Sequence, residues 1–302
     1  MFPILEARNL APEVRLFRVR APRIAKRRQP GQFVIVRLHE DGERIPLTIA
    51  DASREEGTIT LVVQGVGKTT RLMNLLAAGD SILDVVGPLG MASEIDRFGT
   101  VAVVGGGVGA AIAYPTAAAF HAAGNRVLTV LGARTRELLV LEAELSRVSD
   151  ELAVATDDGS AGRRGLATDV LAEILAREPV DRVLAIGPIP MMRAVAELTR
   201  PLGVKTIVSL NSIMVDGTGM CGGCRVRVGG ESRFACVDGP EFDAHEVDFA
   251  VLAERNAGYR EAEQQALAAF LADPDRELAR VRESCRLAAA GAGAPDGQEV
   301  AR

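Results

Sequence analysis

The stretch TVAVVGGGVGAAIAYPTAAAFHAAG, residues 100–124, constrains the fold of this 302-residue chain more than any other. It has the pattern of a buried strand, a glycine-rich turn and a helix. Glycines in such a turn let a backbone approach a pyrophosphate, and the start of the helix supplies N–H donors and a positive dipole end. The spacing is G-x-G-x-G rather than G-x-G-x-x-G, so a glycine-rich turn without a ligand is the alternative. The glycines concerned are Gly105, Gly106, Gly107 and Gly109.

More strand and helix signals follow this turn. NRVLTVLGAR, ELAVATDD and VDRVLAIGP have the composition of strands, with helical stretches between them. Strands that alternate with helices predict a doubly wound parallel α/β domain, which we place at residues 99–210. A glycine-rich turn after the first strand of such a sheet favours a nucleotide ligand.

The first 98 residues have a different pattern. VRLFRVRAP, QFVIVRLHE and GTITLVVQ carry β-branched and aromatic residues at short intervals, and Pro/Gly turns separate them. One short helix is expected from Thr70 to Ala78, ended by Gly79. Residues 1–98 are therefore predicted to form an antiparallel β-barrel.

Two shorter segments complete the prediction of a multidomain β plus α/β protein. Residues 211–250 are glycine-rich, contain three cysteines and are too short to build a core of their own. Residues 251–302 are predicted to be a helical tail that breaks at Asp273 and continues as a charged helix to Leu287. The Ala/Gly-rich end that follows is expected to be disordered.

Composition and motifs exclude several classes of function. A net charge of −5 argues against a nucleic-acid surface. No apolar run is long enough for a membrane span, and charges interrupt the N-terminal stretch, so we expect a cytoplasmic protein. The three histidines show no ligand or triad spacing. QGVGKTT is not a P-loop, because Val62 stands where the motif needs its first glycine.

The cysteines form the most specific pattern. In MVDGTGMCGGCRV, Cys221 and Cys224 make a C-x-x-C pair, and Cys236 follows twelve positions later. Plant-type 2Fe–2S loops read C-x4-C-x2-C with a distant fourth cysteine. On that template the first ligand position falls on Asp216, a hard oxygen ligand in place of sulfur. The spacing favours a 2Fe–2S cluster held by Asp216, Cys221, Cys224 and Cys236.

Two other readings of these cysteines stay open at this point. A structural zinc site uses four ligands, usually with a second close pair, which this stretch lacks. A plain thiol pair is the remaining alternative. Cys285 lies far away in the charged tail, and we expect no role for it in a cluster.

These motifs together resemble a known family. SLNSIMVDGTGMCGGCRV and FACVDGPEFDAHEVDF are similar to the small subunit of NADH-dependent ferredoxin:NADP oxidoreductase, a family also described as the sulfide dehydrogenase β subunit. Both resemble the electron-transfer subunit of dihydroorotate dehydrogenase, within the ferredoxin-reductase superfamily. The resemblance runs from about Pro30 to Arg260, and the aspartate in place of a cysteine is a mark of this family.

The resemblance implies FAD on the barrel, NAD(H) on the doubly wound domain and a 2Fe–2S cluster in the third segment. It places the flavin against the strand at residues 44–48, against the strand that ends at Gln64 and against the turn at Gly67–Thr70. A phosphate-binding role of that turn explains its likeness to a P-loop. The superfamily usually has Arg three residues before the Ser/Thr, whereas Arg44 is four before Thr48, so the role of Arg44 is open. The implied flavin residues are Arg44, Ile45, Pro46, Leu47, Thr48, Val63, Gln64, Gly67, Thr69 and Thr70.

The nicotinamide dinucleotide is expected at the carboxyl ends of the parallel strands. The resemblance places it at Gly105–Gly109, with Thr156, Asp157, Gly187 and Pro188 at later strand ends. No acidic residue closes the second strand, and Arg134 there could equally face a 2′-phosphate. The family favours NAD.

The resulting hypothesis is an electron-transfer flavoprotein subunit of the bifurcating type. Its implied partner is a larger glutamate-synthase-like iron–sulfur flavoprotein, with ferredoxin reached through that partner. The alternatives are a sulfide dehydrogenase or polysulfide reductase subunit and a dihydroorotate dehydrogenase electron-transfer subunit. A redox sensor or a zinc-stabilised binding module is the non-enzyme alternative.

Overall fold

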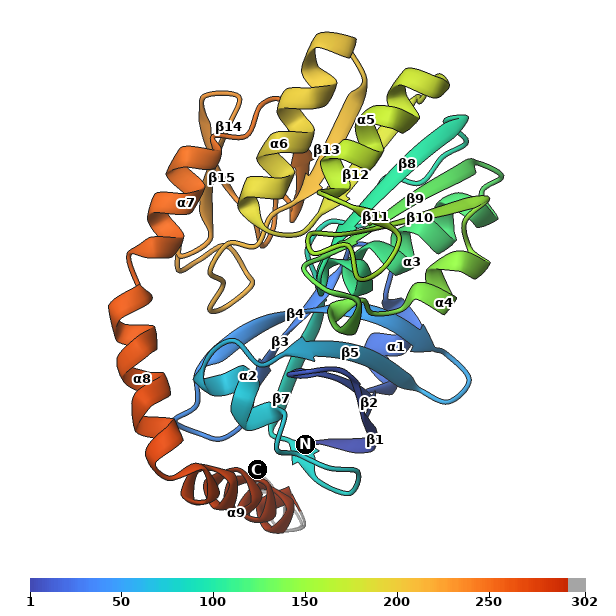
Figure 1. The fold of residues 1–302 in the computed structure, drawn as a ribbon. Coiled ribbons are helices and arrows are strands. Elements are labelled where there is room, and N and C mark those ends of the chain that lie inside the picture. Colours follow the sequence, from blue (N-terminus) through green and yellow to red (C-terminus); the bar gives the residue numbers. More distant parts are fainter. Residues whose placement is uncertain (293–302) are drawn as a thin grey trace, which may run out of the picture.

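The computed structural model describes residues 1–292, and its first 89 residues build one antiparallel sheet. The strand order is β6-β1-β2-β5-β4-β3-β7. Only Leu83 separates the two edge strands β6 and β7 in sequence, so the sheet curls round toward a closed barrel (Figure 1). The strands are β1 (Phe2–Ala11), β2 (Val14–Arg20), β3 (Phe33–Arg37), β4 (Arg44–Ser53), β5 (Thr58–Gln64), β6 (Ser81–Ile82) and β7 (Asp84–Leu89).

Two short helices accompany the barrel, α1 (Pro22–Arg27) and α2 (Lys68–Met73). The expected helix from Thr70 to Ala78 was misplaced. Thr70 accepts hydrogen bonds from the N–H groups of Val66 and Gly67, both at 3.0 Å, so its side chain closes the turn that starts the helix at Lys68. The helix ends at Met73, where Asn74 is the C-cap.

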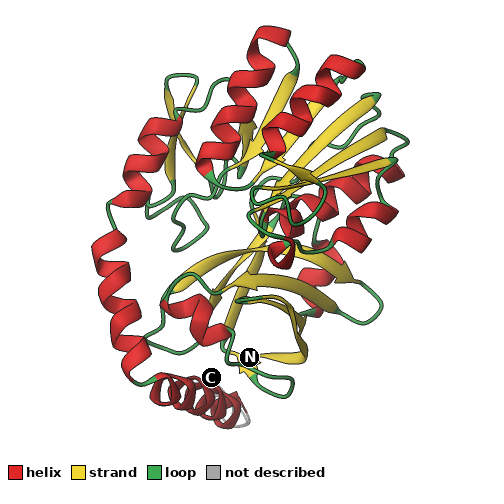
Figure 2. Ribbon diagram, in the orientation of Figure 1, coloured by secondary structure: helices red, strands yellow, loops and turns green. Residues whose placement is uncertain are grey.

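The second sheet is the expected parallel one, with helices on both faces (Figure 2). Its order is β11-β10-β9-β8-β12-β13-β16, parallel throughout except for the β13–β16 pair. Its strands are β8 (Thr100–Gly106), β9 (Arg126–Ala133), β10 (Glu151–Thr156), β11 (Arg163–Arg164), β12 (Arg182–Ile186), β13 (Lys205–Ser209) and β16 (Glu241–Asp243).

Alternate residues of β8 enter two different cores. Val101 and Val103 pack with α3 (Gly109–Ala122) and α4 (Glu142–Arg147). Ala102 and Val104 pack with α5 (Ala167–Arg177) and α6 (Ile189–Thr199) on the opposite face. This alternation explains why the strand lacks a polar face. Two single-turn helices, η1 (Arg136–Leu138) and η2 (Arg200–Leu202), complete the domain.

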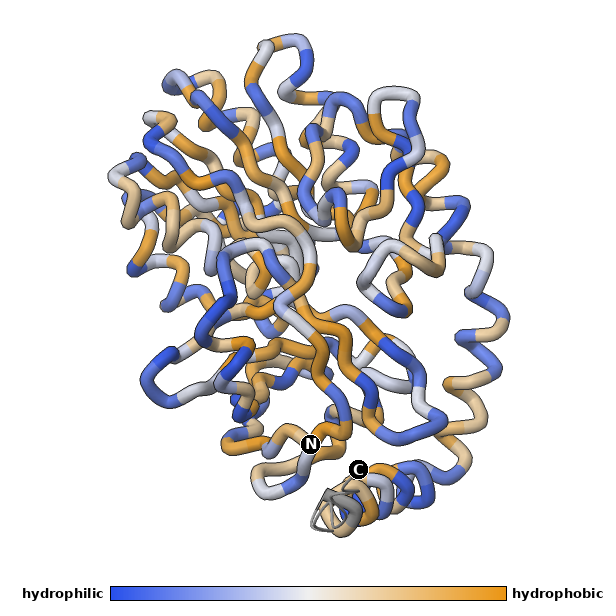
Figure 3. Tube along the Cα trace, turned by 180° about the vertical axis from the view of Figure 1, so that it is seen from behind, coloured by the Kyte–Doolittle hydropathy of each residue, from blue (hydrophilic) through white to orange (hydrophobic). Residues whose placement is uncertain are grey.

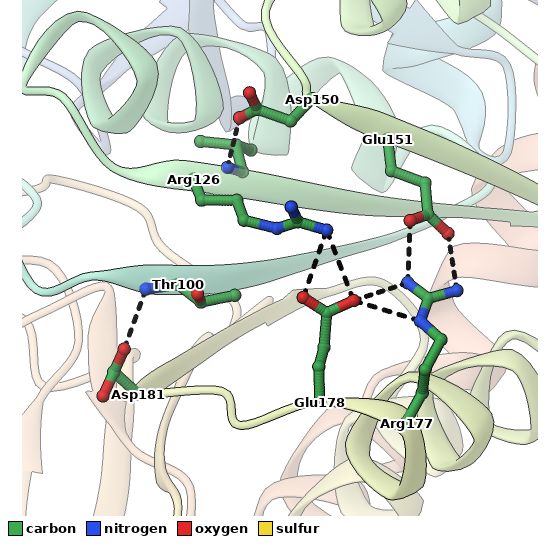
Figure 4. Close-up of polar contacts among 8 residues, drawn as sticks. Thr100, Arg126, Asp150, Glu151, Arg177, Glu178 and Asp181 are labelled. Carbon is green, nitrogen blue, oxygen red and sulfur yellow. Dashed lines mark hydrogen bonds and ion pairs between the residues drawn. The ribbon is translucent and has the colours of Figure 1, made fainter.

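Ion pairs fix the amino-terminal edge of this sheet, away from the glycine-rich turn (Figure 4). Arg177 binds Glu151 at 2.7 Å and Glu178 at 2.8 Å. Glu178 also lies 3.1 Å from Arg126. The ion pairs connect the end of α5 to the starts of β9 and β10. They involve no residue at the carboxyl edge of the sheet, where the glycine-rich turn lies.

The cysteine-bearing segment shares the core of the parallel sheet rather than forming its own. Its hairpin consists of β14 (Arg225–Val228) and β15 (Glu231–Phe234), and its strand β16 pairs with β13. Cys224, Cys236 and Phe242 lie in one buried cluster with Val208 of β13. The segment is therefore anchored to the doubly wound domain.

The tail consists of α7 (Phe249–Ala257), α8 (Arg260–Ala272) and α9 (Pro274–Ala292). It runs down one side of the molecule from the hairpin to the far end of the barrel, where α9 lies across it (Figure 1). The break at Asp273 is confirmed. The expectation of a disordered end was wrong for 288–292, which are helical, and its remainder, 293–302, lies outside the described residues.

Hydropathy follows this architecture. Figure 3 shows hydrophobic stretches along the strands of both sheets, and many of the outer turns are hydrophilic. Among residues 1–292, no helix combines the length and the apolar character that crossing a membrane requires.

Candidate functional site

The glycine-rich turn lies beside the turn after β12. Strands β8 and β12 are neighbours, and the strand order reverses between them, which is where doubly wound sheets bind ligands. A Cβ on Gly109 would lie 2.3 Å from the carbonyl oxygen of Ile186, and one on Gly187 would lie 3.1 Å from the Cα of Gly106. The structure thus brings Gly105–Gly109 and Gly187–Pro188 together, with no room for side chains between them.

One glycine of the turn faces open space instead. Gly107 has a φ of +57°, and a Cβ there would meet nothing within 4 Å. Its N–H donates to the carbonyl oxygen of Gly132 at 2.8 Å, which ties the turn to the end of β9. One side of the turn is therefore bound to β9 and the other side is open, as binding of a pyrophosphate requires.

Thr156 and Asp157 lie at the same edge but not in this crevice, because β9 separates β10 from β8. Thr156 is fully buried, and its hydroxyl donates to the carbonyl oxygen of Ala161 at 2.8 Å. Its hydroxyl therefore ties the end of β10 to the following loop. Asp157 is exposed, as is Arg134 at the end of β9.

Strand β4 carries the expected flavin-side residues. Residues 45–48 are half-buried and pair with β3, with Ile35 opposite Pro46 and Phe33 opposite Thr48. Arg44 is exposed at the start of the strand. Val63 on β5 is 1% exposed, so its side chain belongs to the barrel core and only its backbone could face a ligand. Gln64 is half-buried at the end of β5.

The GKTT turn follows Gln64 and is stabilised by its own hydroxyls. The Thr70 hydroxyl holds the N–H groups of Val66 and Gly67, and that of Thr69 donates to Glu43. A Cβ on Gly67 would meet nothing within 4 Å, so one side of the turn is open. The turn thus joins the start of α2 to the β3–β4 turn.

Asp216 turns its carboxylate back onto its own loop. Its Oδ1 accepts a hydrogen bond from the N–H of Thr218 at 2.8 Å, and its Oδ2 accepts one from the N–H of Cys221 at 2.9 Å. These bonds lower the pKa of Asp216, with the Thr218 bond the largest cause. A carboxylate oxygen has two lone pairs, so each oxygen keeps one for a metal ion.

The three cysteines divide into exposed and buried positions. Cys221 is exposed, and its Sγ accepts a hydrogen bond from the N–H of Gly223 at 3.5 Å. Cys224 and Cys236 are buried, and the N–H of Cys236 donates to the Sγ of Cys224 at 3.4 Å. Burial raises the pKa of Cys236 to about 12, and Cys224 and Asp216 nearby add to the increase. Such a thiol becomes a thiolate only when a cation binds.

Backbone N–H groups link Asp216 to Cys221 and Cys224 to Cys236, and Asp216 also lies near Cys236. Within residues 1–292, no three His, Cys, Asp or Glu side chains lie together in a group that could hold a metal ion. A cluster with two irons distributes its ligands over both ions. The donor set, three cysteines and one aspartate, is the set that the spacing of the loop assigns to a two-iron cluster.

The cysteine loop rests on the barrel. Gly217, with a φ of +74°, lies so close to β7 and β3 that a Cβ there would be 2.5 Å from Leu89 Cδ1 and 3.1 Å from Ile35 Cγ1. Ile35 is the residue that pairs with Pro46. Figure 1 shows the loop between the β14–β15 hairpin and the barrel. The loop and β4 are thus separated by a single strand.

A buried polar contact at the same junction was not predicted from the sequence. Glu241 of β16 accepts a hydrogen bond from the Ser93 hydroxyl at 2.7 Å, and Ser93 lies 3.1 Å from the Thr116 hydroxyl of α3. Burial raises the pKa of Glu241. The contact joins the segment between β7 and β8 to α3 and to the cysteine segment. Ser93 and Glu241 are 148 positions apart, so no local motif signals it.

Comparison with known proteins identifies the family. Residues 211–248 match the iron–sulfur cluster binding domain of dihydroorotate dehydrogenase B. Over 268 residues the chain is 51% identical to a Thermotoga maritima protein named dihydroorotate dehydrogenase B (NAD(+)), electron transfer subunit homolog, covering 89% of this chain and 95% of that one. The chain belongs to the dihydroorotate dehydrogenase B electron-transfer subunit family. A probable member from Methanopyrus kandleri is 34% identical over 245 residues, covering 81% of this chain and 90% of its own length.

A solved structure agrees with this assignment. A chain from a study of flavin-based electron bifurcation by NADH-dependent reduced ferredoxin-NADP oxidoreductase is 50% identical and superposes with a TM-score of 0.86. The match covers 90% of this chain and 98% of that one. A cytochrome P450 reductase from Amycolatopsis, at 24% identity and a TM-score of 0.55, shares the ferredoxin-reductase fold; the match covers 66% of this chain and 65% of that one.

Family and fold together settle the cofactors and the class of protein. This member of the electron-transfer subunit family is an oxidoreductase subunit whose cofactors are an iron–sulfur cluster, FAD and NAD(H). The expected iron–sulfur cluster is confirmed over the zinc alternative.

Proposed function

We propose that this chain is the small subunit of an NADH-dependent ferredoxin:NADP oxidoreductase that carries out flavin-based electron bifurcation in the cytoplasm. Two observations support this choice within the family. The chain is 50% identical to a subunit chain from such an oxidoreductase over 98% of that chain. It also carries Asp216 at the first ligand position, the mark of the resemblance described above.

The observation that carries the proposal is that helix α3 and the cysteine loop both lie against the barrel beside residues 45–48. Helix α3, which starts at the glycine-rich turn, packs against β4 and shares a buried cluster with Ala50. The cysteine loop contacts Ile35 on the neighbouring strand. A flavin along residues 45–48 would thus lie near both the dinucleotide turn and the cluster loop.

The chain's own residues have positioning roles in this proposal. When bound, FAD and the cluster supply hydride acceptance and single-electron transfer. Gly105–Gly109 and Gly187–Pro188 receive the dinucleotide, residues 44–48, 63–64, 67, 69 and 70 hold FAD, and Asp216, Cys221, Cys224 and Cys236 hold a 2Fe–2S cluster. No general acid or base is required, which agrees with the absence of triad spacing around the histidines.

The proposed partner is a larger glutamate-synthase-like iron–sulfur flavoprotein, through which ferredoxin is reached. A dihydroorotate-oxidising partner is the second candidate, because the curated relatives carry that name. Asp216 argues against this candidate, since the cluster loop of that subfamily resembles one with four cysteines.

Anaerobic purification followed by metal analysis and a visible spectrum tests the cofactor assignment. We expect one FAD and about two irons per chain, since one 2Fe–2S cluster is bound. Zinc without iron would refute it. Affinity purification from the native host then tests the partner: recovery of a dihydroorotate-binding barrel enzyme instead of an iron–sulfur flavoprotein would favour the second candidate.

A further inference from the structure

Helix α9 packs against the barrel, although residues 90–273 lie between them in the sequence. Val281 is 1% exposed and belongs to the barrel core, and Leu278 packs against the same core. Cys285 donates a hydrogen bond from its Sγ to the carbonyl oxygen of Ser81 on β6 at 3.3 Å. The helix is thus firmly seated across the end of the barrel (Figure 1).

The charged side of α9 holds two barrel loops at once. Glu277 Oε2 lies 3.2 Å from Lys68 Nζ at the start of α2. Arg280 donates to Glu277 Oε1 at 3.0 Å and to Asp41 Oδ2, in the β3–β4 turn, at 3.1 Å. The Glu277 side chain is only 14% exposed, so solvent screens this chain of charges less than it screens a surface pair.

One of the two loops is the GKTT turn, which is proposed to hold FAD, and the other leads into β4, the proposed flavin strand. Lys68 stands between Gly67 and Thr69 in the GKTT turn, and Asp41 precedes Arg44 by three residues. The hydroxyl of Thr69 donates to Glu43, so the loops also bind each other directly. A displacement of Lys68 or Asp41 would therefore disturb the turn that is proposed to hold FAD.

We propose that α9 slows the release of FAD by holding the turn Gly67–Thr70 in place, with Glu277 as the positioning residue that acts through Lys68. The inference rests on the proposed function, because it assumes that FAD occupies this turn. A turn already ordered before binding loses less conformational freedom when the ligand arrives. Removing the ion pair should raise the FAD dissociation constant roughly three- to tenfold, as expected for freeing one or two side chains.

The test compares FAD release from three single variants. Purified protein is diluted into flavin-free buffer, and released flavin is followed by its fluorescence, with iron content as an internal reference. We expect E277Q to release FAD faster than wild type, and E277D, which keeps the charge, to release it more slowly than E277Q. E283Q is the matched control, because Glu283 is on the same helix but binds only Arg286 of that helix.

A second readout does not depend on FAD. Hydrogen exchange of residues 66–73 in flavin-free protein should be faster in E277Q than in wild type or E283Q. Equal FAD release and equal exchange in E277Q and wild type would overturn the proposal. Wild-type protein that binds iron but no FAD would refute the proposed function instead, and exchange at 66–73 would then decide alone whether α9 holds the turn.

Discussion

Asp216, at the first position of the proposed ligand set, offers oxygen donors, which are harder than a thiolate sulfur, and it makes contacts within its own loop. Its two oxygens hold the N–H groups of Thr218 and Cys221, so the loop is closed even without a metal ion. The position of this residue could be predicted from spacing alone, because ligand loops are local in sequence. Its hydrogen bonds could not, because they depend on the backbone path through Gly217 and Gly219.

Exchanging this ligand should change the redox potential of the cluster. D216C restores the C-x4-C-x2-C pattern, and we expect a 2Fe–2S cluster with a lower midpoint potential, because thiolate sulfur donates more electron density to ferric iron. D216A should give a labile, partly empty site, since only three ligands remain. Redox titration with electron paramagnetic resonance measures both; identical spectra and potentials in all three proteins would show that Asp216 is not a ligand.

Cys285 should be dispensable for the cluster. It is 7% exposed, and its Sγ binds Ser81 on the barrel, away from the loop of Asp216. We expect C285S to keep full iron content and to lose at most about 1 kcal/mol of unfolding free energy, as for a small change at a buried site. Iron analysis and denaturant unfolding check this, and a loss of iron would contradict the ligand assignment.

At the scale of elements, the strand–turn–helix at residues 100–122 was predictable because its signals are contiguous. Helix α9 could be predicted only in part. The Ala/Gly-rich composition after Leu287 suggested disorder, yet alanine has the highest helix propensity, and the preceding turns are anchored by Val281 and Cys285. Burial of the anchor, which composition does not reveal, lets the helix continue.

The close packing of the glycine-rich turn gives a prediction at this scale. In G109A the new Cβ would lie 2.3 Å from the carbonyl oxygen of Ile186, so the start of α3 must move away from β12. We expect slower reduction of the flavin by NADH, with FAD and iron content unchanged. Stopped-flow bleaching measures the rate. G258A is a control for a glycine substitution outside the turn, since Gly258 has a φ of −62° and the nearest atom to a Cβ there would be the carbonyl oxygen of Arg255 at 3.4 Å. Equal rates in G109A and wild type would refute the turn's role.

At the scale of the whole molecule, the relation between the units was not predictable from the sequence. Gly217 against Ile35, Glu241 against Ser93 and Glu277 against Lys68 each join residues more than a hundred positions apart. No periodicity or motif encodes such pairs, because each depends on both folded partners. The first of these contacts puts the cysteine loop one strand away from the proposed flavin strand, and helix α3, which starts at the glycine-rich turn, packs against that strand.

The junction of α9 with the barrel should weaken in acid. Burial and the nearby Arg280 lower the pKa of His39, although Glu277 opposes them. Burial would raise the pKa of Glu277, but Arg280 and Lys68 outweigh it and lower that pKa. Asp41 completes the set of charges at this junction.

Both lowered pKa values make the folded chain less stable as the pH falls. An unfolded chain takes up a proton at His39 below its ordinary pKa of 6.5, whereas the folded chain does so only at lower pH, so stability falls as the pH drops below 6.5. The contribution of Glu277 is present above its ordinary pKa of 4.5 and is lost as the pH falls through its lower folded pKa.

Denaturant unfolding of the barrel at about pH 7.5, 5.5 and 4 should therefore show a steady loss of stability in wild type. H39Q should flatten the slope between the first two points and E277Q the slope between the last two. If both variants keep the wild-type slopes, other groups control the acid sensitivity and these two do not titrate as their surroundings indicate.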